Sequence, residues 1–176
     1  MSDSPAPAPY VEPWLRGTHS DLPATARAAV HALELAQDDL RKWTAELTET
    51  EIHAAPFGLT TVATQLRHIA GSIDRILSYA EGKRLMDEQL ARQQTEESGS
   101  QSLAELTTAV EAAITLAFAR VRVLAGQDLE QPLAVGRKQL PSSLGGLLVH
   151  VADHTQRHVG QVVATAKVLR GLRTGS

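Results

Sequence analysis

Apolar residues recur every three or four positions over four long stretches of this chain, and this spacing constrains its fold more than any other feature. Steps of three and four residues follow the 3.6-residue turn of an α-helix. They predict helices over about 21–47, 60–80, 102–124 and 144–169. No stretch shows the alternation of apolar and polar residues that is typical of a half-buried strand. The sequence therefore predicts an all-α protein.

The four predicted helices are amphipathic, and a chain of 176 residues is about one domain long. Amphipathic helices bury their apolar stripes by packing against one another, so we predict a four-helix bundle. Its connections are long. The polar stretch 81–101 is expected to extend the second helix and then form a loop, and 127–143 to form a loop whose apolar residues pack down. Wirings other than simple up-and-down therefore stay open.

The first twenty residues differ from the rest because they are rich in proline. Pro5, Pro7, Pro9 and Pro13 favour extended backbone and lack the amide hydrogen that a helix needs. We therefore expect an extended N-terminal arm over 1–20. The remainder, residues 21–176, is expected to form a single bundle domain.

Composition excludes several classes of function. The net charge of −3 argues against sequence-independent binding to nucleic acid, which needs a basic face. The chain has no cysteine, so disulfides, thiolate nucleophiles and cysteine-bound metals are excluded. No apolar run is long enough to cross a membrane, and the N-terminus lacks the pattern of a secretory signal. We expect a soluble, cytoplasmic protein without membrane contact.

Three of the seven histidines, His150, His154 and His158, follow one another at intervals of four on the last predicted helix. Residues four apart on a helix face the same way, so two of these imidazoles can reach one metal ion. The outer pair is about 12 Å apart along the axis, too far to share an ion. A helical wheel places His158 inside the apolar stripe, His154 at its edge and His150 outside it. The predicted ligand pair is therefore His154 and His158.

A catalytic zinc site takes three protein ligands and keeps one position open. The candidates for the third ligand are His68, His53 and His31. His68 lies in the middle of a predicted helix, about 120° from the centre of its apolar stripe, so it would reach the last helix from a flank. Single histidines such as His19, His31 and His53 are more typical of ordinary surface or core positions. The spacing alone does not choose among them.

Several groups near the ligand pair are candidates for supporting roles. His150, Asp153 and Gln161 are predicted to orient the imidazole rings, since the second ring nitrogen of a metal-bound histidine needs a partner. Arg157 and Arg67 could contact an anionic substrate. Ordinary surface charge is the alternative for both arginines.

Two segments together resemble the DinB-like (DNA-damage-inducible) superfamily of four-helix metalloproteins. They are 66–71, Leu-Arg-His-Ile-Ala-Gly, and 154–161, His-Thr-Gln-Arg-His-Val-Gly-Gln. Members carry one histidine on the second helix and a His-x-x-x-His-x-Gly-Gln segment on the fourth. The resemblance covers about residues 20–170. It implies a DinB-like bundle.

The resemblance also implies a metal site. By position, its ligands are His68, His154 and His158, and the ion is divalent, such as zinc or nickel. Val159 replaces an arginine that is frequent in the family, but that arginine is not a ligand. Some relatives are transferases or isomerases that act on low-molecular-weight thiols such as mycothiol, bacillithiol or glutathione, and homodimers are common among them.

The resemblance thus implies a metal-dependent thiol S-transferase with a small-molecule substrate and a homodimeric state. The metal would bind the thiol as its thiolate. Three alternatives stay open. One is a hydrolase that activates water on the metal, with Glu51 or Asp153 as the base. The others are a non-catalytic metal-binding or interaction module and a plain helical bundle. The negative net charge argues against a DNA-repair role.

Overall fold

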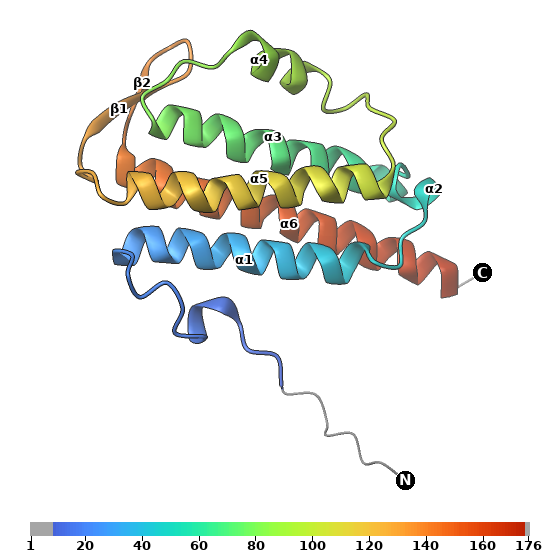
Figure 1. Ribbon diagram of the computed structural model, residues 1–176. Helices are drawn as coiled ribbons and strands as arrows, with labels where there is room; N and C mark the ends of the chain where they lie inside the picture. The colour runs from blue at the N-terminus through green and yellow to red at the C-terminus, as the bar shows by residue number, and fades with distance from the viewer. Residues whose placement is uncertain (1–8, 175–176) are drawn as a thin grey trace.

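Four long helices packed side by side make up most of the protein (Figure 1). The structure is a computed structural model, and it describes residues 9–174. The long helices are α1 (Ala24–Thr44), α3 (Val62–Ala80), α5 (Leu103–Leu124) and α6 (Leu144–Thr174). α1 and α3 each pack against both α5 and α6. The predicted all-α class and the four-helix bundle are confirmed.

The apolar stripes read from the sequence form the core between these helices. Each long helix contributes fully buried aliphatic side chains, and burying one is worth about 1.5–3 kcal/mol. Examples are Leu33, Leu66, Ile73, Ile114 and Leu148. In the part of the chain that the structure describes, no helix is both long and apolar enough to cross a membrane.

The helices do not alternate in direction (Figure 1). α1 and α6 run the same way, whereas α3 runs against α6 and parallel to α5. The parallel pair is tied at one end, where Arg120 near the end of α5 donates to Glu81 just after α3. Parallel neighbours need a crossover along the length of the bundle. This requirement explains why the connection over 81–102 is long.

The crossover contains its own helix, α4 (Asp87–Gln94), so the prediction that the second helix extends past residue 80 was wrong. α3 ends at Ala80 because Gly82 takes a left-handed φ of 69° and its amide bonds back to the carbonyl of Tyr79. The chain then turns and carries α4 across the outer side of α3 (Figure 1).

A two-stranded hairpin joins α5 to α6, and the sequence did not predict it. β1 (Pro132–Val135) pairs antiparallel with β2 (Leu140–Ser143). Strands of four residues are too short to show a clear alternation. The apolar residues of β1, Leu133 and Val135, pack against the core, as expected for this connection.

The remaining boundaries differ by a few residues. α1 begins at Ala24, three residues after the start expected from the sequence, and the side chain of Asp21 pairs with Arg122 on α5 rather than capping the helix. The break after α1 holds the short helix α2 (Glu49–Ile52) and the single turn η2 (Pro56–Gly58). In the segment predicted as an arm, residues 1–8 lie outside the described residues.

The described part of that segment carries one helical turn, η1 (Pro13–Leu15), which packs against α1. The side chains of Tyr10 and Arg16 both bond to Asp38 on α1. These contacts attach the segment to the bundle.

α6 runs to Thr174, five residues past its predicted end at 169. The guanidinium of Arg173 holds this extra turn, because it donates to both carboxylate oxygens of Glu51 and to the carbonyl of Glu46. The pairing also lowers the pKa of Glu51 to about 2. A local pattern of apolar residues cannot reveal a contact made with a distant segment.

Arg173→Ala is therefore expected to fray the last turn of α6 and leave the rest of the bundle intact. Amide hydrogen exchange after Gly171 should become faster, while exchange around Val162 should not change. Lys167→Ala, an exposed change on the same helix, serves as the control. Unchanged exchange at the C-terminal turn in the Arg173 variant would contradict this assignment.

Candidate metal centre

Three of the predicted residues meet where α3 and α6 pack together. His68 lies on α3, and His154 and His158 lie one turn apart on α6. The Nε2 atoms of His68 and His154 are 3.0 Å apart. The ring of His158 lies 4.3 Å from that of His68 and 4.6 Å from that of His154, measured between centroids. His68 lies on the flank of α3, about 120° from the centre of its apolar stripe. The antiparallel packing of α3 and α6 nevertheless places this flank beside His154 and His158.

The cluster has the dimensions of a metal site. One ring nitrogen from each histidine can be chosen so that all three lie within 4.8 Å of one another. Two imidazole nitrogens bound to one ion at about 2.0–2.1 Å are about 3.0–3.4 Å apart, which matches the pair on His68 and His154. All three side chains are half-buried. Imidazole nitrogen suits zinc, nickel and other first-row ions, so the residues fit a divalent metal.

In two of the three histidines, a hydrogen bond holds one ring nitrogen and leaves the other nitrogen free to bind a metal. The Nδ1 atom of His68 lies 2.7 Å from Oε2 of Glu96, and a carboxylate only accepts, so Nδ1 is the donor. The Nδ1 atom of His158 lies 2.7 Å from Oε1 of Gln65 and donates in the same way. In each neutral ring the proton sits on Nδ1, and the lone pair of Nε2 is free to bind a metal.

Glu96 is itself fixed in place. Its second oxygen, Oε1, accepts a hydrogen bond of 2.7 Å from Arg75, whose side chain is only 8% exposed. Arg67 donates to the backbone carbonyl of Glu96 and anchors the chain after α4. Burial raises the pKa of Glu96, but the bonds from His68 and Arg75 outweigh it and hold that pKa below its usual range. Glu96 is therefore a charged acceptor for His68 at neutral pH.

Sequence reasoning missed both Glu96 and Gln65. Gln65 precedes His68 by three residues on α3, so shared helical spacing could have pointed to it. Glu96 lies 28 residues after His68 in a segment expected to be a loop, and no local pattern indicates it.

The predicted supporting residues lie at the rim. The Nδ1 atom of His150 is 2.9 Å from Asp153, and Arg157 pairs with the other oxygen of Asp153 at 3.6 Å. His150, Asp153 and Arg157 are exposed. Gln161 is exposed too, and its side chain hydrogen-bonds to His158. Gln161 thus contacts His158, and the ring of His150 lies 5.3 Å from that of His154, measured between centroids.

The remaining candidates lie elsewhere. His53 bonds to the carbonyl of Gln101. Arg67 bonds to backbone carbonyls and to Gln101, so it holds the crossover in place. Glu51 pairs with Arg173, which is 15 residues and about 22 Å along α6 from His158. Glu51 therefore cannot act as a base at this cluster.

His19, His31 and Glu34 form a separate group between the N-terminal segment and α1. Arg122 donates to Nδ1 of His19 at 2.9 Å, so the proton of a neutral His19 is on Nε2, which faces Glu34 at 2.8 Å. His31 bonds to Thr18 at 3.1 Å. These bonds form a network that fastens the segment to α1.

Burial keeps His154 and His158 neutral at pH 7. Burial, together with the neighbouring His158 and His68, lowers the pKa of His154 to about 4. Burial also lowers the pKa of His158, again helped by His68. Only neutral imidazole binds a metal, so at pH 7 both rings are in the form that binds.

The lowered pKa of His154 predicts how stability depends on pH in metal-free protein. His154 binds a proton less readily in the folded chain than in the unfolded chain. Protonation therefore does not reduce the free energy of unfolding above pH 6.5, but it reduces this free energy increasingly as the pH falls toward 4. Over this range the melting temperature of wild type should fall more steeply than that of His154→Gln. His53→Gln should follow wild type. Parallel profiles for wild type and His154→Gln would refute the assignment.

Comparison with known proteins agrees with the architecture. A family model described as the DinB superfamily matches residues 32–162, well over half of the chain. The matched range contains His68, His154 and His158. A search of curated proteins finds no match. The resemblance seen in the sequence is confirmed: this chain belongs to the DinB superfamily.

Proposed function

We propose that His68, His154 and His158 hold a divalent ion, zinc or nickel, and that the protein is a transferase that activates a low-molecular-weight thiol there. The observation that carries the proposal is the convergence of the three imidazoles on one point, with the opposite nitrogens of two rings bound to Glu96 and Gln65. Three protein ligands leave coordination positions for an incoming ligand. When bound, the ion supplies a Lewis acid that favours the thiolate form of a thiol.

The surrounding carboxylates favour a thiol over water as the nucleophile. Activated water usually needs a base beside the metal. Glu96 has both oxygens occupied, by His68 and Arg75, and so has Asp153, by His150 and Arg157. A thiol bound to a metal is deprotonated without a base. Since the chain has no cysteine, the thiol must come from another molecule.

The residues of the chain then have distinct roles. The three histidines bind the ion, and Glu96 and Gln65 hold two of the rings at the correct tautomer. Arg75 keeps Glu96 charged and in place. The exposed side of the cluster, at His150 and Asp153, faces solvent and gives a ligand access.

Cobalt-loaded protein tests the proposal. Mycothiol, bacillithiol and glutathione are titrated separately, and binding of at least one should produce a sulfur-to-cobalt charge-transfer band. The same thiol should be consumed by zinc- or nickel-loaded protein with a reactive electrophile. Both signals should vanish in His154→Ala and persist in His150→Ala. Metal binding without a charge-transfer band or turnover would contradict the transferase, and ester hydrolysis that needs no thiol would favour the hydrolase.

A further inference from the structure

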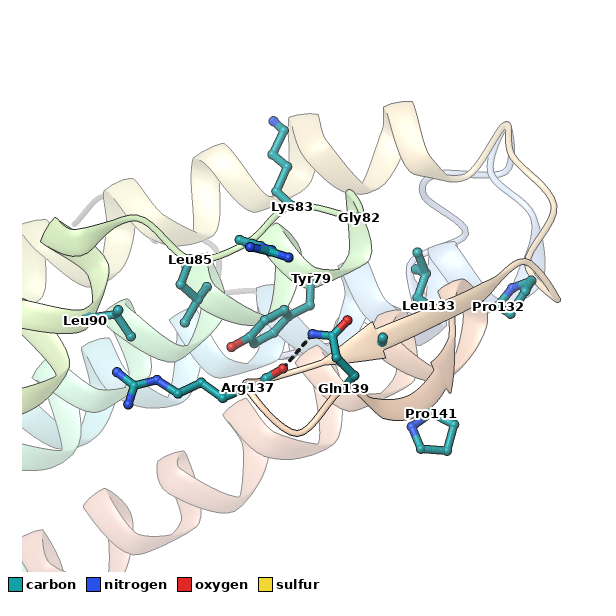
Figure 2. Close-up of a pocket in the computed structure, with 13 residues that line it drawn as sticks. Tyr79, Gly82, Lys83, Leu85, Leu90, Pro132, Leu133, Arg137, Gln139 and Pro141 are labelled. Atoms are coloured by element: carbon teal, nitrogen blue, oxygen red, sulfur yellow. Dashed lines mark hydrogen bonds between the residues drawn. The ribbon is translucent and has the colours of Figure 1, made fainter.

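A pocket of about 860 Å³ lies between the loop after α3 and the β1–β2 hairpin (Figure 2). We call it the hairpin pocket. Small-molecule sites commonly have volumes of about 300–1,000 Å³, so it can hold a metabolite. Its lining comes from residues 79–90 and 132–141. Figure 2 shows Tyr79 between the two segments and Arg137 extending from the hairpin.

The charge of the hairpin pocket is opposite to that of the protein. The chain has a net charge of −3, yet Lys83, Arg84 and Arg137 line the pocket and no carboxylate does. Lys83 pairs with Glu81 at 2.8 Å. Within residues 9–174, neither Arg84 nor Arg137 forms an ion pair with a carboxylate. Two guanidinium groups are therefore available to an anion.

Most of the rest of the lining is apolar, including the ring of Tyr79 and the side chains of Leu85, Leu90, Leu133 and Pro141. Gln139 also lines the pocket, and its amide donates to the carbonyl of Gly136. A guanidinium matches a carboxylate or phosphate with two parallel hydrogen bonds, whereas leucine and proline favour a hydrocarbon body. The combination selects a ligand with an anionic head and an apolar portion.

The hairpin pocket lies on the same face of α3 as the histidine cluster. Tyr79 follows His68 by 11 residues, which is three turns plus about 20°, so the two share a face and lie about 16 Å apart along the axis. On the other side, β2 leads directly into α6, which carries His154. An elongated molecule along the junction of α3 and α6 would reach from the pocket to the cluster.

We propose that the hairpin pocket binds the anionic end of an elongated organic acid or phosphate monoester whose reacting group lies at the histidine cluster. This inference rests on the proposed function for the identity of the reacting end. In this proposal, Arg84 and Arg137 recognise the head group. The loop after α3 and the β1–β2 hairpin determine specificity.

The first experiment tests the hairpin pocket alone, on the full chain without added metal. Hexanoate, hexyl phosphate and neutral hexanamide are titrated while backbone amides are followed by NMR. Hexanoate or hexyl phosphate should shift amides within 79–90 and 132–141, and hexanamide should bind about tenfold more weakly or worse. Comparing the two anions identifies the preferred head group. Equal binding of hexanamide and both anions would overturn the proposal.

Substitutions of single residues distinguish a specific anion site from non-specific electrostatic attraction. Arg137→Gln and Arg84→Gln should each weaken anion binding about fivefold or more. Lys138→Gln removes a neighbouring charge that does not line the pocket, so it should leave anion affinity nearly unchanged. An equal loss in Lys138→Gln and Arg137→Gln would show non-specific attraction and overturn the proposal.

The second experiment tests whether one ligand can reach both the hairpin pocket and the histidine cluster. Mercaptoacetate, mercaptohexanoate and mercaptoundecanoate are titrated into cobalt-loaded protein, with the charge-transfer band as the signal. Arg137→Gln should weaken only the longest thiol, because only that chain reaches both sites. Equal effects on all three thiols, or none, would overturn the shared substrate.

Failure of the proposed function has a different signature. No charge-transfer band with any thiol would refute thiol binding at the metal and, with it, the shared substrate. Anion binding in the NMR titration would remain in that case. If the thiols bind cobalt while neither anion shifts the pocket amides, the hairpin pocket proposal alone is wrong.

Discussion

His154→Ala is expected to reduce bound zinc or nickel from about one equivalent per chain to a small fraction of one. The Nε2 atom of His154 lies 3.0 Å from that of His68, and its ring contacts that of His158, so it is central to the cluster. Its removal leaves two ligands, and affinity should fall by more than about a hundredfold, beyond the loss typical of a supporting residue. Elemental analysis of untagged protein and a calorimetric metal titration measure the effect.

His150→Ala provides the matched control. It removes an imidazole one turn away on the same helix, and the ring of His150 lies 5.3 Å from that of His154. Because His150 pairs with Asp153 at the exposed rim, its loss should leave metal stoichiometry unchanged. A full equivalent of metal in His154→Ala, or equal losses in both variants, would rule out the three-histidine site.

Glu96→Ala is expected to reduce both metal affinity and stability. His68 loses the acceptor that fixes its tautomer, which should weaken metal binding about 10–100-fold. Arg75, with a side chain 8% exposed, loses its partner. Leaving a largely buried guanidinium unpaired should cost about 2–3 kcal/mol of unfolding free energy, less than a fully buried pair because Glu96 keeps some exposure. Metal titration and denaturant unfolding of metal-free protein measure the two effects.

Two comparisons make the Glu96 prediction specific. Glu97→Ala removes the neighbouring, exposed carboxylate and should change neither quantity. Glu96→Gln keeps an oxygen that can accept from His68 but loses the charge, so it should restore part of the metal affinity. Wild-type metal affinity in Glu96→Ala would show that Glu96 does not orient His68.

Most of the architecture can be predicted from the sequence, because the helices pack through apolar residues whose helical spacing is visible locally. The apolar steps that contain Leu33, Leu66, Ile114 and Leu148 place these side chains in the core. The elements that were not predicted depend on contacts distant in sequence or on strands too short to show a period. α4 crosses the outer side of α3, and the last turn of α6 depends on Glu51.

The candidate site divides in the same way. The spacing of His154 and His158 on one helix follows from sequence, as does the position of His150 outside the stripe. His68 could be selected only through family resemblance, because its role depends on how α3 and α6 pack. Glu96 reaches His68 across 28 residues, and the sequence holds no periodic sign of that contact.

The most direct test of the metal site is X-ray absorption spectroscopy of protein loaded with one equivalent of zinc. The predicted spectrum contains scattering from three imidazole rings, with zinc–nitrogen distances of about 2.0–2.1 Å, and the remaining coordination from light atoms. In His68→Ala the number of imidazoles should fall to two or the zinc should be lost. Fewer than three imidazoles in the wild type, or no zinc retained at one equivalent, would contradict the site.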